Sequence, residues 1–294
     1  MQTSGQIAAT SKTAYVGVRG ILLPVDFNES NRKAARQARV LASRFKASVT
    51  LLHVREGSEL LRSSSQGVHG ALSLTRNRLR VFGADELCGV KVKQLVLSGY
   101  PATTIAEFAD RQHCDLIVMP THGYGPVRRF LLGSVTAEVL ERARCPVWTI
   151  ASSRWESNGS AVKQVLCGVT FAPAAANVIR WAALFANAFG ATLSVLSVLP
   201  SAPPQDVPEW FVPEWNEGAL PGLESRVRGL VQELDVHADI LVDKGDPATI
   251  HLDVARTQNA DLLVIGRTTR KSREDIGGNT YAIVRHAPCP VLNV

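Results

Sequence analysis

The segment GYPATTIAEFADRQHCDLIVMP, residues 99–120, contains the pattern that decides the fold. A stretch with the apolar period of a helix leads into a short apolar run, DLIVM, of the length of a buried strand. The segment GDPATIHLDVARTQNADLLVIG, residues 245–266, repeats this order in the second half of the chain. A helix followed by a buried strand, written twice, indicates two copies of one α/β unit.

Three further pairs of segments support this duplication and keep one common spacing between the copies. They are ILLPVDF (21–27) with VLCGVTF (165–171), FKASVTLLHV (45–54) with FGATLSVLSV (189–198), and ARCPVWTI (143–150) with APCPVLNV (287–294). We therefore divide the chain into a tail at 1–19, a first domain at 20–150, a linker at 151–161 and a second domain at 162–294. The proline-rich insertion at 199–222 is expected to be a loop packed on its own domain.

Short runs of Val, Ile and Leu alternate with longer stretches of helical period in each copy. A first helix is predicted from one apolar stripe, which comprises residues 34, 35, 38, 41, 42 and 45. Its predicted N-cap is Asn28 or Ser30. Strands are expected at 21–26, 48–54, 90–97, 115–119 and 146–150. This alternation predicts an α/β fold of two doubly wound, parallel, five-stranded sheets with a Rossmann-like architecture.

Composition limits the class of protein. The chain has 294 residues, a formal net charge of +6 and five cysteines without a CxxC pair, which argues against a disulfide framework or a zinc ribbon. The first twenty residues lack the apolar core of a signal peptide, and no apolar run is long enough for a membrane span, so we expect a cytoplasmic protein. The first 150 residues hold 20 Lys and Arg against 11 Asp and Glu, but these charges follow helix faces, and a nucleic-acid partner is not expected.

The loop MPTHGYGPVRRFLLGSVT, residues 119–136, is suited to hold phosphate. It leaves the carboxyl end of a predicted parallel strand, where open α/β sheets bind their ligands. Its last part, from Gly133 to Thr136, precedes the helical stretch AEVLERAR, so backbone N–H groups and hydroxyls lie at a helix N-terminus, which favours anions. Arg128 and Arg129 add positive charge or belong to a solvated loop.

Other catalytic patterns fail on spacing. The chain contains no GxxxxGK[ST], no complete GxGxxG, no GxSxG and no HExxH. His53 stands inside a predicted strand and is interpreted as a packed residue, whereas His122 in the loop remains open. We therefore predict no catalytic residues and no resident metal, and at most slow hydrolysis of a bound nucleotide.

The chain resembles the universal stress proteins in five segments, which occur in the order LLPVDF, TLLHV, DLIVM, THG-x9-GSVT and CPVWTI. The duplication resembles a tandem member of that family. The resemblance implies a fold of the nucleotide-binding alpha hydrolase type. It also implies ATP, accompanied by Mg²⁺, as the ligand of the first domain. It also implies pairing through the last strand, here CPVWTI with CPVLNV within one chain, and allows a homodimer. The residues that it assigns to the nucleotide are Pro24, Asp26 and Val54 around adenine and ribose, Met119 and Val135 in the pocket, and Gly123, Gly133, Ser134 and Thr136 at the phosphates.

Some of these residues have a simpler interpretation. Pro24, Val54 and Met119 also suit plain core packing, and Asp26 also suits a helix N-cap. The family's loop reads G-x-x-G-x9-G-[ST], and this chain has Pro120 at its first glycine, which removes an N–H donor.

The second copy departs from the motif. Gly168 replaces Pro24, Thr170 replaces Asp26, and the loop GRTTRKSREDIGG is two residues shorter. In that loop Thr269 stands at the place of Gly123, and Gly278 at the place of Ser134. The second domain is therefore expected to have lost nucleotide binding and to act as a built-in partner of the first.

Two functional hypotheses remain. The first is a stress-response protein that binds ATP or a related adenine nucleotide in its first domain. The second is an interaction and dimerisation module of the same fold that binds no nucleotide, which Pro120 favours. An ATP pyrophosphatase of related fold is excluded, because VDFNES lacks the SGGxDS loop that such an enzyme needs.

Overall fold

The computed structural model describes residues 17–56, 65–121, 132–150, 162–170, 174–201, 219–267 and 278–294. The first half contains β1 (Gly20–Pro24), α1 (Glu29–Phe45), β2 (Ser48–Arg55), α3 (Ser65–Glu86), β3 (Val92–Ser98), α4 (Pro101–Arg111), β4 (Leu116–Pro120), α5 (Ser134–Arg142) and β5 (Val147–Ile150). The second half contains β6 (Gln164–Val169), α7 (Ala175–Phe189), β7 (Thr192–Leu199), α8 (Ala219–Glu233), β8 (Asp239–Lys244), α9 (Pro247–Thr257), β9 (Leu262–Ile265), α10 (Gly278–His286) and β10 (Val291–Asn293). The predicted linker and most of the proline-rich insertion lie outside the described residues.

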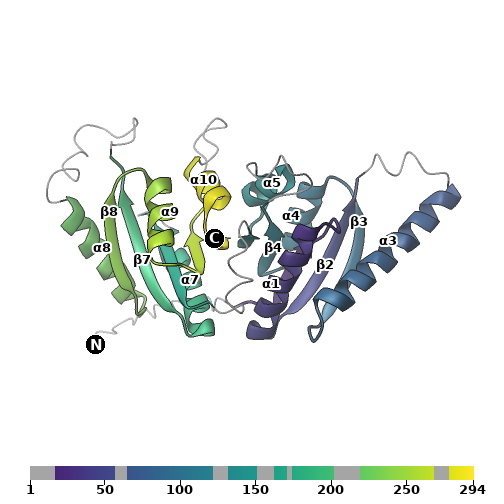
Figure 1. Ribbon diagram of the computed structural model, residues 1–294, viewed down its shortest axis with the longest axis horizontal. Coiled ribbons are helices and arrows are strands. Elements are labelled where there is room, and N and C mark those ends of the chain that lie inside the picture. Colours follow the sequence, from purple (N-terminus) through teal and green to yellow (C-terminus); the bar gives the residue numbers. More distant parts are fainter. Residues whose placement is uncertain are drawn as a thin grey trace, which may run out of the picture.

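The two predicted parallel sheets are confirmed, and they join edge to edge into one ten-stranded sheet. The strand order is β3-β2-β1-β4-β5-β10-β9-β6-β7-β8, and every neighbouring pair is parallel except one. The exception is the antiparallel pair of β5 and β10, in which Trp148 lies opposite Leu292. The last strands of the two copies thus pair within the chain, as the resemblance implied, and the C-terminus lies near the junction (Figure 1).

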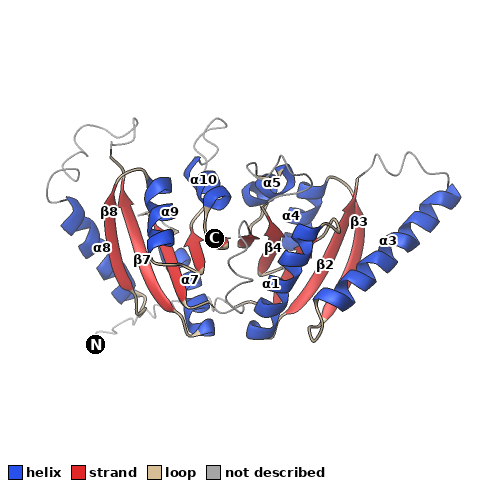
Figure 2. Ribbon diagram, viewed as in Figure 1, coloured by secondary structure: helices blue, strands red, loops and turns tan. Residues whose placement is uncertain are grey.

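Helices cover both faces of the sheet and separate two hydrophobic clusters (Figure 2). Helices α1, α3, α7 and α8 contribute to the cluster on one face, and α4, α5, α9 and α10 to the cluster on the other. Both clusters contain residues of both halves, so the core is continuous across the β5–β10 pair. Burial on both faces explains why the strands read as nearly continuous apolar runs.

Helix α1 follows the sequence pattern closely. The predicted stripe is buried from Ala34 to Ala42, and Phe45 packs against it partly buried. Asn28, one of the two predicted caps, is the N-cap: its side chain accepts the N–H of Asn31, and the Asn31 side chain accepts in return from the backbone of Asn28. Lys46 ends the helix in a left-handed conformation.

An aromatic cluster holds the two halves together on the face of α1 and α7. The ring of Phe185 stacks on Trp148 with centroids 5.4 Å apart and meets Phe45 edge-on at 5.2 Å. The buried Trp148 indole donates a hydrogen bond to Gln37 Oε1 over 2.7 Å. Because Phe45 and Gln37 belong to α1 and Phe185 to α7, these contacts tie the first half to the second.

None of the described helices is long and apolar enough to cross a membrane.

Candidate functional site

The chain turns sharply after β1, and the turn places Asp26 at the carboxyl edge of the sheet. Pro24 ends β1 as a buried residue, and Asp26 is exposed two positions later. Phe27 has φ 65°, a left-handed conformation that is rare for a bulky side chain. Such a conformation persists only where the surroundings hold it, and it is frequent at binding sites.

Aromatic and cationic contacts hold Phe27 in this conformation. Its ring lies 4.9 Å from the ring of His53 and 6.2 Å from that of Phe82, and the Arg78 guanidinium lies 4.4 Å from its centre. His53 Nδ1 donates to the Val25 carbonyl oxygen over 2.7 Å, which keeps the imidazole against the turn. His53 is thus a packed residue of β2, as the sequence predicted, and it braces the turn that carries Asp26.

The Asp26 carboxylate is oriented by the cap of α1. It accepts the backbone N–H of Asn28 over 3.3 Å and the Asn28 side-chain amide over 3.0 Å. The backbone N–H of Asp26 donates to Asn31 Oδ1 over 2.8 Å. The pKa of this carboxyl is raised, because surrounding protein displaces water from it. The hydrogen bonds from Asn28 and the field of His53 act in the opposite direction and are smaller. The cap of the helix is therefore Asn28, and Asp26 keeps carboxylate surface facing solvent.

Two hydrogen bonds fix the N-terminus of α5 against the end of β4. Gly133, the N-cap, donates its N–H to the Thr121 carbonyl oxygen over 2.7 Å, and Thr136 Oγ1 donates to the Pro120 carbonyl oxygen over 2.9 Å. Thr136 is buried and Ser134, at the first helical position, is exposed. Because the Thr136 proton is used in this bond, its hydroxyl positions the helix and has no proton left to donate to a ligand.

The backbone at Gly133 does not itself require glycine. Its φ of −61° and ψ of 137° are open to any L-residue. Glycine is required where the backbone is left-handed, and Gly133 is not such a position. A residue without a side chain at this helix N-terminus leaves room for something to approach the backbone.

The sheet brings the two parts of the site to one edge. Strands β1 and β4 are parallel neighbours, and Pro24 of β1 lies beside Leu52 of β2. Met119 belongs to one hydrophobic cluster against which Val54 and Val135 pack partly buried. We call these three residues the apolar floor; Val54 and Met119 lie near the carboxyl ends of β2 and β4, and Val135 lies in the first turn of α5. Gly123, together with His122, Arg128 and Arg129, lies outside the described residues.

The corresponding edge of the second domain is filled differently. A Cβ atom placed on Gly168 would lie 2.3 Å from His251 Nε2, so the imidazole occupies the space directly over this residue. His251 is 6% exposed, and its Nδ1 donates to the Pro247 carbonyl oxygen over 2.6 Å. Burial lowers the pKa of His251. Thr170 is exposed, and Thr269 lies outside the described residues.

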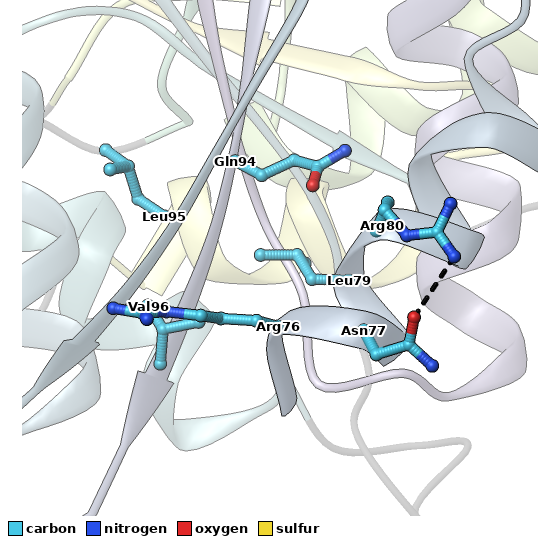
Figure 3. A pocket seen from close by; sticks show the side chains of 7 residues that line it. All are labelled: Arg76, Asn77, Leu79, Arg80, Gln94, Leu95 and Val96. Carbon is cyan, nitrogen blue, oxygen red and sulfur yellow. Dashed lines mark hydrogen bonds between the residues drawn. The ribbon is translucent and has the colours of Figure 1, made fainter. Parts of the chain in front are cut away.

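Several features of the site were not predicted. The role of Phe27 depends on tertiary contacts. The contacts of Asn31 are local, and Asn-x-x-Asn after a strand is a recognisable capping pattern. A pocket of about 460 Å³ lies elsewhere, between α3 and β3 (Figure 3). Among the described residues no group of three or more His, Cys, Asp or Glu side chains could hold a metal ion.

Comparison with known proteins gives consistent matches. The family described as "Universal stress protein family" matches residues 17–151 and again 161–294. A universal stress protein of Methanocaldococcus jannaschii is 32% identical over 145 residues, which are 46% of this chain and 84% of that protein. A universal stress protein of Mycobacterium tuberculosis is 27% identical over 232 residues, 77% of each chain. The crystal structure of a universal stress protein from Archaeoglobus fulgidus superposes with a TM-score of 0.72 at 19% identity, over 95% of this chain and 97% of that one, and shows a shared fold.

Proposed function

Because the chain belongs to the universal stress protein family, we propose that it is a cytoplasmic stress-response protein whose first domain binds ATP or a related adenine nucleotide. The nucleoside would lie on the floor formed by Met119, Val54 and Val135, with Asp26 accepting from the ribose hydroxyls. The phosphates would lie at the N-terminus of α5, on Gly133 and Ser134. Mg²⁺ would enter with the triphosphate, as a counter-ion of its oxygens.

The observation that carries this proposal is the fixed N-terminus of α5 at the edge where Asp26 emerges. The N–H groups of the first helical residues have no acceptor within the helix, and the helix dipole favours an anion there. Ser134 is exposed beside them, and Gly133 has a backbone conformation that needs no glycine. The absence of a side chain at Gly133 is therefore best explained by the close approach of a phosphate.

The variant Ser134→Ala tests the phosphate assignment. A hydrogen bond to a charged group contributes about 1.5–3 kcal/mol, so ATP should bind roughly ten- to a hundredfold more weakly. Adenosine, which has no phosphate, should bind as it does to the wild type. The melting temperature should not change, because Ser134 is exposed. Equal losses for ATP and adenosine would place Ser134 at the nucleoside instead.

We further propose that one nucleotide binds per chain and that the second domain is an intrachain partner. His251 fills the space over Gly168, the residue that corresponds to Pro24, and Thr170 offers no carboxylate where the first domain has Asp26. Calorimetric titration of the full chain with ATP should give a stoichiometry near one. Asp26→Asn should weaken binding strongly, whereas Thr170→Val, at the equivalent place, should leave it unchanged. Two equal sites would contradict this assignment.

The rival function is an interaction module without a nucleotide, and Pro120 is the observation that favours it. Proline cannot donate an N–H at the first position of the family's loop. In this structure its carbonyl oxygen already accepts the Thr136 hydroxyl. Mass spectrometry of ligand released from the purified protein separates the two functions, because the rival predicts that no adenine nucleotide is recovered and that ATP does not raise the melting temperature.

A further inference from the structure

We propose that the free edge of β3, together with α3, is a docking surface for an extended acidic segment of a partner protein, which would add to the sheet as a further strand. The surface comprises the pocket residues Arg76, Asn77, Leu79, Arg80, Gln94, Leu95 and Val96, shown in Figure 3. The proposal does not depend on the nucleotide, because β1 and β2 separate β3 from α5 and β4.

The first observation is an open sheet edge. In the part of the chain that the structure describes, β3 is the last strand on its side of the sheet. The Lys91 carbonyl oxygen accepts from Val49 of β2, and the Gly99 N–H donates to Arg55 of β2. Because backbone groups alternate in direction along a strand, the intervening odd-numbered residues also face β2. The N–H and C=O groups of Gln94 and Val96 therefore point away from the sheet and can pair with an added strand.

The second observation is positive charge beside these same residues. The side chains of Gln94 and Val96 lie on the face covered by α3, where Gln94 lies close to Gly83 of the helix. Arg76 and Arg80 line the pocket from α3, and both are exposed. The Arg80 guanidinium donates a hydrogen bond over 3.1 Å to the uncharged side chain of Asn77. Neither Arg76 nor Arg80 forms a salt bridge with another described residue.

The spacing of the arginines fits a strand. Arg76 and Arg80 are one helical turn apart, a rise of about 6 Å. Alternate residues of an extended segment lie about 6.6 Å apart on the same face. Two acidic side chains at alternate positions of the added strand would thus reach the two guanidinium groups, and the residue between them would face the side of Leu95. This pattern defines the partner as a segment that alternates acidic and apolar residues.

The third observation concerns exposed apolar side chains on α3 and directly after β3. The large apolar side chains that are exposed among the described residues are Leu74 (68%) and Val81 (45%) of α3 and Tyr100 (74%), which follows β3. Leu74 and Val81 belong to α3, the helix that packs on β3, and Tyr100 follows the end of β3 by two residues.

The test uses the full chain and a fluorescein-labelled peptide in which glutamate alternates with valine over the 7 residues of β3. Fluorescence anisotropy should show saturable binding that weakens with salt. Arg76→Ala and Arg80→Ala should each weaken binding about two- to fivefold, the range of exposed ion pairs. Arg78→Ala is the matched control, because Arg78 shares the helix and the charge but lies over the Phe27 ring. It should leave the affinity unchanged.

Backbone pairing is tested with the peptide itself. N-methylation of one alternate set of its amides should abolish binding, and methylation of the other set should be tolerated, because only one edge of an added strand faces β3. Equal behaviour of the two methylated peptides would overturn strand addition. The proposal also fails if the peptide does not bind, if Arg78→Ala weakens it as much as Arg80→Ala, or if free glutarate displaces it at the peptide's own concentration, which would indicate a small-anion pocket.

Discussion

Replacing Gly168 with alanine should destabilise the second domain through a direct collision with His251. The new Cβ would lie 2.3 Å from Nε2 and 2.5 Å from Cδ2 of the imidazole, well inside contact distance. The ring cannot turn aside freely, because its Nδ1 holds the Pro247 carbonyl oxygen over 2.6 Å and the residue is 6% exposed. Overpacking costs about 1–3 kcal/mol and a lost hydrogen bond about 0.5–1.5 kcal/mol, so we expect a loss of roughly 2–4 kcal/mol in the free energy of unfolding.

Urea denaturation of the full chain measures this loss, and a double-mutant cycle assigns it to the pair. In the His251→Ala background the same change at Gly168 should cost at least about 1 kcal/mol less, because the collision is gone. Gly229→Ala is the control, since a Cβ there meets nothing within 4 Å and the residue lies inside α8, where alanine stabilises. A loss for Gly168→Ala below about 0.5 kcal/mol, or an equal loss in both backgrounds, would refute the reasoning.

Three further predictions concern the core and its titratable groups. Phe185→Ala should remove about 3–5 kcal/mol of stability and speed amide exchange in β5 and β10, because the fully buried ring stacks on Trp148 across the junction; unchanged protection of β5 would contradict this coupling. Burial lowers the pKa of His251 in the folded chain. As the pH falls, the unfolded chain therefore takes up a proton on this imidazole before the folded chain does, and the free energy of unfolding should decrease below pH 6.5. The variant His251→Gln should lose that part of the pH dependence, and an unaltered profile would exclude His251 as its source. Burial raises the pKa of Cys145 to about 12, whereas Cys88 is exposed, so a thiol reagent at neutral pH should modify Cys88 first in the folded chain; rapid labelling of Cys145 would show that its site opens.

The candidate site could be predicted only where its residues follow one another in the chain. Gly133 and Ser134 precede a helix in the sequence, and the structure places them at the start of α5. The role of Thr136 differs in kind, because its hydroxyl donates to the Pro120 carbonyl oxygen, a contact across the loop. The apolar floor of Met119, Val54 and Val135 was implied by family resemblance, and its assembly depends on the order of the strands.

The sequence by itself determined the helices and strands, because their apolar spacing is a local pattern. Apolar periods define strands and helices because burial on one or both faces selects residues at fixed spacings, and the stripe of α1 and its Asn28 cap follow from such spacings. The duplicated segments determined that this unit occurs twice.

The tertiary structure alone decided which distant residues meet. Nothing near Gly168 in the chain indicates that His251 covers it, and nothing near Phe27 indicates the aromatic contacts that hold its left-handed backbone. Nothing in β3 itself shows that no described strand pairs with its outer edge. These facts depend on how strands are ordered and how helices pack over them. Such contacts are set by the summed burial of the whole core, which no local period of the sequence encodes.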